Sequence, residues 1–181
     1  MTLFIYILMI CIVFCLLCIW YVAIYNKFQG FVIRLNEAEA SIDTTLRKRF
    51  DLLNKSISII KANAEIEDEI LENIIKLRSR KLTNFELDRQ LYDAINEFEQ
   101  YKATYPVLMT SESFVKIDAG LTETETEIYA CRKYYNDIVT DYNEYIRTFP
   151  SNIVGKLCHL KQRTYFDGKD MNDDILNDFK L

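Results

Sequence analysis

Apolar residues recur every three or four positions in the stretch that begins at Phe114 and ends at Phe149. Their average spacing of about 3.5 residues is typical of a helix that packs at a shallow angle in a bundle or coiled coil. Pro150 ends the pattern. We therefore predict one long helix whose buried face consists of Phe114, Ile117, Leu121, Thr124, Ile128, Cys131, Tyr135, Ile138, Tyr142, Tyr145 and Phe149.

One part of this stretch has a second possible interpretation. Residues 121–128 alternate threonine with glutamate, which by itself is typical of a β-strand. The alternation lies inside the uninterrupted helical pattern, however, and a strand there would divide it in two. We expect these residues to be helical.

A nearly continuous apolar run begins at Leu3 and ends at Ile24. As a helix it would be roughly 33 Å long, and a bilayer has a hydrocarbon core of about 30 Å. A cleaved signal peptide would begin with basic residues and end in small residues before the cleavage site, and this run has neither feature. A lipoprotein signal would have a small residue before its cysteine, whereas Leu17 precedes Cys18. We predict a membrane anchor at residues 1–26.

The remaining chain also follows helical spacing. Residues 28–64 form one such pattern and residues 64–81 another, and the sequence leaves open whether the second is a separate helix or continues the first around a bend near residues 62–64. Thr83 and Glu86 have the spacing of a capping box, which predicts the start of a further helix. We expect an all-α fold: an antiparallel helical bundle at residues 27–166, with a helical turn or two after Pro150, and a frayed acidic tail at residues 167–181.

The residues that flank the apolar run predict its orientation. No Lys or Arg precedes the run, whereas Lys27 and Arg34 follow it. Basic residues favour the cytoplasmic side of a membrane, and Trp20 and Tyr21 have the position of an interfacial aromatic belt. We therefore expect a single-pass protein of the cell membrane, with a short N-terminus outside and the bundle in the cytoplasm.

Overall charge argues against nucleic-acid binding. The chain has 22 basic and 27 acidic residues, a net charge of −5, and its basic residues are scattered. The one basic triplet, Arg47, Lys48 and Arg49, lies roughly 30 Å from the membrane along a straight helix. We expect it to form a solvated or salt-bridged helix face, paired with the acidic start of residues 64–72.

Catalytic and metal-binding groups are scarce. A single histidine, His159, is too few for the paired Glu-x-x-His motifs of a di-iron bundle or for a His-rich zinc site. Two acidic clusters have oxygen ligands suited to a divalent cation, although solvated helix faces explain them better. These clusters are Glu65, Asp68, Glu69 and Glu72, and Glu123, Glu125 and Glu127. We predict no cofactor, no metal site and no enzymatic activity.

A repeated Tyr-Asn pair is the most distinctive polar feature of the long helix. Because Tyr135 and Tyr142 are seven residues apart, the asparagines that follow them also align. Such residues either fix the register by hydrogen bonding to the first helix or line an exposed groove for a partner helix. The candidate face consists of Tyr135, Asn136, Asp137, Val139, Tyr142, Asn143 and Ile146, and a candidate structural end motif follows it at Phe149, Pro150, Ser151 and Asn152.

The segment RKYYNDIVTDYNEYIRTFPSNI at residues 132–153 resembles the signature of the LemA family. The block LRKRFDL at residues 46–52 and the stretch at 121–132 resemble two further family blocks, and Tyr165-Phe166 fits its C-terminal part. Departures occur at Glu39, where the family tends to have Trp, and at Asn54-Lys55, where it usually has Pro-Asn. The resemblance implies a bacterial, single-span membrane protein with an antiparallel helical bundle and no assigned enzymatic activity.

These patterns together favour an interaction or scaffold protein, anchored in the bilayer through Leu3 to Ile24. Its expected partner is another membrane-associated protein or a second copy of itself. Two alternatives remain open at this point. One is a metal-binding or catalytic bundle that uses carboxylates, and the other is a protein that relays a signal across the membrane.

Overall fold

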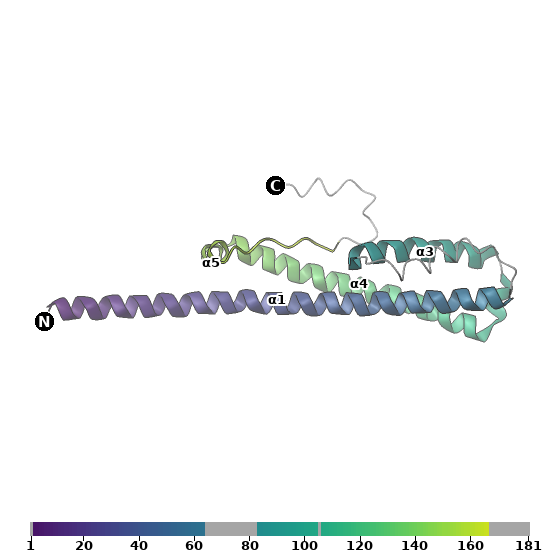
Figure 1. Cartoon of the computed structure of the whole chain (residues 1–181), viewed down its shortest axis with the longest axis horizontal. Helices are drawn as coiled ribbons and strands as arrows, with labels where there is room; N and C mark the ends of the chain where they lie inside the picture. Colours follow the sequence, from purple (N-terminus) through teal and green to yellow (C-terminus); the bar gives the residue numbers. More distant parts are fainter. Residues whose placement is uncertain (1, 64–82, 105, 167–181) are drawn as a thin grey trace. The chain divides into compact units, whose positions relative to one another are not determined.

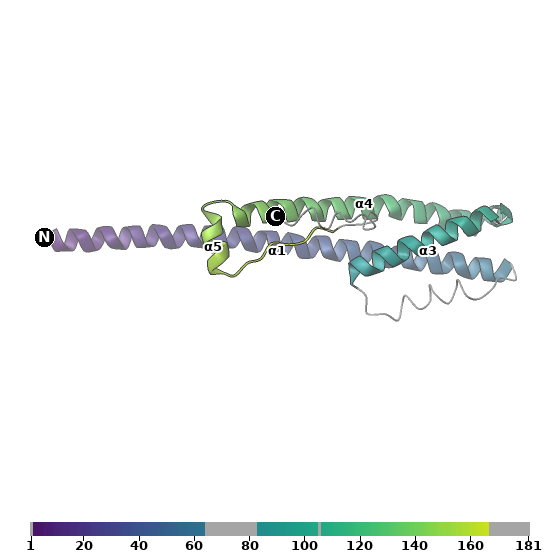
Figure 2. The same ribbon diagram turned by 90° about the horizontal axis from the view of Figure 1, so that it is seen from above.

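The computed structural model describes residues 2–63, 83–104 and 106–166, and helices dominate these ranges (Figures 1 and 2). Their order is α1 (Thr2–Asn63), α3 (Asn84–Thr104), a 3-10 helix η1 (Pro106–Thr110), α4 (Glu112–Arg147) and α5 (Ser151–Leu157). No strand occurs in the described ranges, and residues 121–128 are helical within α4. The all-α prediction is confirmed. The predicted second helix at 64–81, the bend before it and the tail at 167–181 lie outside the described residues.

The chain divides into two compact units, and both α1 and α4 contribute to each. Unit 1 contains Met1–Glu37 and Tyr135–Tyr165, so it includes α5. Unit 2 contains Ala38–Tyr134 together with Phe166 among the described residues, so it includes α3.

In unit 1, the exposure of α1 changes at the end of the predicted span. Every side chain of residues 2–20 is exposed, and this part of the helix is long and apolar enough to cross a membrane. From Ile24 onward, one side chain in each turn is buried. The buried residues of unit 1 are Ile24, Phe28, Phe31 and Leu35 of α1, Tyr135, Ile138, Val139 and Tyr142 of α4, and Ser151, Val154 and Gly155 of α5.

In unit 2, α1 and α3 supply apolar residues that are buried together with those of α4. Phe98 of α3 and Phe114 of α4 have ring centroids 5.7 Å apart, and Gly120 of α4 lies beside the side chain of Leu52. The spacing of three and four in the sequence reappears in the buried set. Its largest fully buried apolar members are Ile42, Leu46 and Leu53 of α1, Leu91 of α3, and Phe114 and Ile128 of α4.

Hydrogen bonds confirm the predicted start of α3 and show how α4 starts. At the start of α3, the Thr83 amide donates to Glu86 Oε2 (3.0 Å) and the Glu86 amide donates to Thr83 Oγ1 (3.3 Å), which is the reciprocal pattern of a capping box. These bonds lower the pKa of the Glu86 carboxyl from its usual 4.5. At the start of α4, the amide of Phe114 donates to Ser111 Oγ.

The end of the long helix corrects one prediction. We placed Phe149 on the buried face, but α4 ends at Arg147 and the Phe149 side chain is 74% exposed. The chain leaves the helical path before Phe149, so this residue no longer follows the rotation that buries Tyr142. The spacing alone could not locate the last helical turn to within two residues.

Candidate functional site

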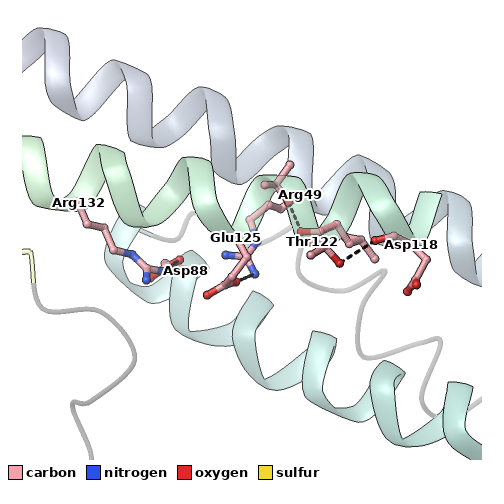
Figure 3. A network of polar contacts seen from close by, with 8 residues as sticks. Arg49, Asp88, Asp118, Thr122, Glu125 and Arg132 are labelled. Carbon is pink, nitrogen blue, oxygen red and sulfur yellow. Dashed lines mark hydrogen bonds and ion pairs between the residues drawn. The ribbon is translucent and has the colours of Figure 1, made fainter. Parts of the chain in front are cut away.

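Two ion pairs that include buried side chains connect the helices of unit 2 (Figure 3). In one, Arg132 of α4 donates to Asp88 of α3, and the side chains are 12% and 4% exposed. In the other, Arg49 of α1 donates to Glu125 of α4; the Arg49 side chain is 2% exposed and the Glu125 side chain is 41% exposed. A charge buried to this degree is tolerated only when it is paired and hydrogen-bonded, so both pairs constrain how the helices of this unit meet.

The basic triplet is salt-bridged, which is one of the two alternatives that we predicted. Arg47 pairs with Asp43 one turn earlier, Lys48 pairs with Glu127, and the buried Arg49 pairs with Glu125. These partners come from α1 and α4, and the acidic residues within 64–72, which we expected as partners, lie outside the described residues. Glu125 and Glu127 are therefore structural counter-ions, which the period-two alternation concealed. The hydrogen bond from Lys48 to Glu127 raises the pKa of the lysine.

A third polar cluster joins α3 to α4. Lys102 donates to Asp118 at 2.8 Å and lies 2.6 Å from Glu99. Burial by itself lowers the pKa of this lysine, but the bonds to the two carboxylates prevail and raise it. Lys102 therefore stays charged at neutral pH and links the two helices.

The network leaves some hydrogen-bonding capacity unused. Arg49 Nε, Arg132 Nε and Gln90 Oε1 are buried without a hydrogen-bond partner.

Within residues 2–63, 83–104 and 106–166, no group of three or more His, Cys, Asp or Glu side chains is arranged to hold a metal ion. The acidic cluster at Glu65, Asp68, Glu69 and Glu72 lies outside these ranges. His159 is exposed, and its Nδ1 lies 3.1 Å from the Lys156 carbonyl oxygen.

The candidate Tyr-Asn face in unit 1 is largely covered by the chain itself. Tyr135, Val139 and Tyr142 are buried, Asn136, Asn143 and Ile146 are half-buried, and Asp137 is exposed. The Tyr142 ring packs edge-on against Phe28 and Phe31 of α1, with centroids 6.1 and 6.2 Å away. The aromatic part of the face therefore contacts the first helix.

Several polar atoms of this face bind the backbone of residues 161–164, a partner that we did not predict. We considered hydrogen bonds to the first helix or a groove for a partner helix. Asn143 holds Arg163 at two points, accepting from its amide and donating to its carbonyl oxygen, both at 2.8 Å. The Tyr142 hydroxyl donates to the Lys161 carbonyl oxygen at 3.0 Å, and burial raises the Tyr142 pKa. Residues 161–164 thus occupy the place where we considered a partner helix.

The predicted end motif connects α4 to α5. Ser151 is buried, and its hydroxyl lies 2.5 Å from the Tyr145 carbonyl oxygen and 2.9 Å from that of Thr148. The Tyr145 carbonyl belongs to the last turn of α4 and Thr148 follows that helix, so no amide within α4 remains to satisfy either group. Pro150 precedes α5 as its N-cap residue, and the Asn152 amide donates to the Thr148 carbonyl oxygen.

Close to the predicted span, unit 1 has contacts that sequence reasoning missed. The Tyr21 hydroxyl lies 3.3 Å from Cys158 Sγ, and Lys27 Nζ lies 4.4 Å from the centre of the Tyr145 ring. Both contacts join the start of the bundle to the region around α5. Nothing in the local sequence signals these contacts, because Cys158 and Tyr145 are more than a hundred positions from Tyr21 and Lys27.

Two comparisons with known proteins agree with the resemblance found in the sequence. The LemA family model matches residues 38–176. Protein LemA of Metamycoplasma hominis is 27% identical over 163 residues, covering 83% of this chain and 72% of that protein. The matched residues include the ion pairs of unit 2 and the Tyr-Asn face.

Proposed function

The chain belongs to the LemA family, and on that premise we propose that it is a single-pass membrane protein whose helical bundle binds another membrane-associated protein or a second copy of itself. The proposal assigns the bundle an interaction or scaffold role and no catalytic step. It also places the short N-terminus outside and the bundle in the cytoplasm.

The observation that carries the proposal is the absence of a linker between the apolar run and the bundle within α1. The exposed apolar side chains of residues 2–20 and the buried Ile24, Phe28 and Phe31 belong to one uninterrupted helix. The first turns beyond the run are therefore core residues of unit 1. A bundle attached in this way stays beside the bilayer, which favours partners that are confined to the same membrane.

Two exposed aromatic side chains of α4 support an interaction role. Tyr129 is 67% exposed and Tyr134 43%, and both belong to unit 2. Large aromatic side chains account for much of the binding energy in protein interfaces. They are five positions apart, about 140° around the helix, so we assign partner contacts to two sides of α4.

Photo-crosslinking from these two positions tests the proposal in living cells. A photoreactive amino acid at position 129 or 134 is expected to capture a membrane-associated protein or a second copy of the chain, identified by mass spectrometry. The matched control is position 128, because Ile128 is buried and should give no intermolecular product. Capture of soluble proteins alone, or equal capture from position 128, would contradict the proposal.

Topology and metal content are tested separately. In a chain without native cysteines, Thr126→Cys, at an exposed position of α4, should resist a membrane-impermeant thiol reagent in intact cells, whereas Thr2→Cys should react. The reverse pattern would place the bundle outside. Elemental analysis of the purified full chain distinguishes the carboxylate-bundle alternative, because stoichiometric iron, manganese or zinc would contradict a role limited to interaction.

A further inference from the structure

Three large apolar side chains are exposed on and beside α5. Phe149 is 74% exposed, Ile153 51% and Leu157 67%. Phe149 immediately precedes Pro150, and the other two residues are one helical turn apart. Apolar side chains gathered in this way generally mark a surface that contacts a protein or a membrane.

This exposure does not come from a loosely attached helix. The opposite side of α5 is fixed by buried Ser151, Val154 and Gly155, and the Ser151 hydroxyl bonds to carbonyls at the C-terminal end of α4. A Cβ atom added to Gly155 would lie only 3.0 Å from Ile146 Cγ1. The close fit on the buried side holds α5 in a definite orientation.

The contacts of α5 place it at the end of the predicted span. Cys158, just after α5, contacts Tyr21, while Gly155 within it lies beside the Phe28 ring. Tyr21 and Phe28 are roughly 10 Å apart along α1, at 1.5 Å per residue, and Ile24 lies between them. Both views show α5 lying crosswise to α1 at this level (Figures 1 and 2). If α1 crosses the bilayer, α5 lies along the membrane surface.

The exposed apolar side chains point away from the bundle. Ile153 and Leu157 are each two positions from Gly155, which is about 200° around an α-helix and hence nearly the opposite side. Gly155 faces Phe28 and Ile146, which are part of unit 1. The two apolar side chains therefore face outward at the depth where the span ends.

The charge around α5 identifies the kind of surface it fits. Residues 145–166 contain four basic side chains and no Asp or Glu, although the whole chain has a net charge of −5. The four are Arg147, Lys156, Lys161 and Arg163. Basic groups beside exposed apolar residues match a bilayer that contains anionic lipids, and the cytoplasmic leaflet is rich in such lipids.

We infer that α5 is an interfacial membrane contact, with the side chains of Phe149, Ile153 and Leu157 inserted among the lipid headgroups and the nearby basic residues bound to anionic lipid. The inference rests on the proposed membrane anchor, because the bilayer can meet α5 only if α1 crosses it. It adds a second attachment, which fixes the rotation of the bundle about the axis of α1.

Depth-dependent quenching tests this attachment on the full chain in phosphatidylcholine/phosphatidylglycerol vesicles. The five native cysteines are replaced, and an NBD fluorophore is attached to one new cysteine at a time: Ile153→Cys, Leu157→Cys, Ile33→Cys or Ile19→Cys. Lipids with a doxyl group near the headgroup serve as quenchers. All four positions are exposed in the structure, so the label fits without displacing core residues.

We expect the NBD fluorescence to be quenched at positions 19, 153 and 157. The quenching at 153 and at 157 should be at least half of that at position 19. Position 33, roughly 14 Å beyond Ile24 along α1, should remain unquenched. Quenching at 19 with 153 and 157 resembling 33 would overturn the α5 contact and leave the anchor intact. An unquenched position 19 would overturn the anchor itself. Quenching at all four positions would mean that the whole bundle lies on the membrane, which would overturn a contact confined to α5.

The charge contribution is measured at position 157. Quenching there should fall when phosphatidylglycerol is replaced by phosphatidylcholine, and it should fall again in the Lys156→Glu variant in mixed vesicles. Lys133→Glu, an exposed lysine of unit 2, is the matched control and should leave the signal unchanged. Equal signals across lipids and variants would overturn the assignment of anionic lipid.

Discussion

The pair formed by Asp88 and Arg132 gives the sharpest test of how unit 2 is held together. Asp88→Asn keeps the shape of the side chain but leaves the 12% exposed Arg132 guanidinium without its counter-ion. Leaving one charge of a buried pair uncompensated is destabilising by about 3–5 kcal/mol. Replacing both partners with apolar residues of similar size, Asp88→Leu with Arg132→Met, should recover most of this loss because no buried charge then remains.

Urea unfolding of the full chain in mild detergent, followed by circular dichroism at 222 nm, measures these free energies of unfolding. The matched control is Glu127→Gln, which breaks a pair whose side chains are 45% and 38% exposed and should destabilise by only about 0.2–1 kcal/mol. If Asp88→Asn is no more destabilising than Glu127→Gln, the Asp88–Arg132 pair does not constrain the bundle. If the double variant is as unstable as Asp88→Asn alone, the loss is due to packing and not to charge.

Three further predictions concern packing and capping, each measured by the same unfolding assay. Gly155→Ala should lower the free energy of unfolding by about 1–3 kcal/mol because the added Cβ would crowd Ile146. The control Gly30→Ala has open space around it and should raise the free energy of unfolding by about 1 kcal/mol. Equal effects of the two substitutions would contradict the close contact of α5. Phe28→Ala should destabilise by about 3–5 kcal/mol, since this ring is fully buried beside Tyr145; a loss below about 1 kcal/mol would contradict its core position. The folded-state pKa of Glu86 is lowered, so its stabilising effect is present above pH 4.5 and is lost as the pH falls through the lowered value; Glu86→Gln should remove this pH dependence, and an unchanged pH profile would contradict the capping role.

Much of the fold follows from patterns among residues that are close together in the sequence. The spacing of buried residues predicted α4, the capping box located the start of α3, and the apolar run identified the exposed part of α1. These features depend on residues within a few positions of each other. A single sequence is sufficient for them because helix geometry converts spacing directly into a face.

The polar contacts were harder to predict because their partners are distant in the sequence. Arg49 belongs to a basic triplet that looks solvated, and only the placement of α4 beside α1 shows that Glu125, 76 positions later, neutralises it. Likewise, nothing local indicates that Asn143 binds the backbone of Arg163, because backbone groups leave no compositional signal. Sequence reasoning found the residues of the candidate face and its contact with the first helix, but it missed the hydrogen bonds to residues 161–164.

These distant contacts solve a problem that the apolar pattern leaves open. A face that repeats every seven residues fits its neighbour almost equally well after a shift of one repeat, so apolar packing alone specifies the register weakly. A shift in unit 2 would separate Arg49 from Glu125 and leave a buried charge unpaired. In unit 1, a shift along α1 would move Gly155 away from the Phe28 ring that it lies beside. The register of each unit is therefore fixed by a contact that tolerates only one alignment, and in unit 1 that alignment keeps α5 level with the end of the apolar run.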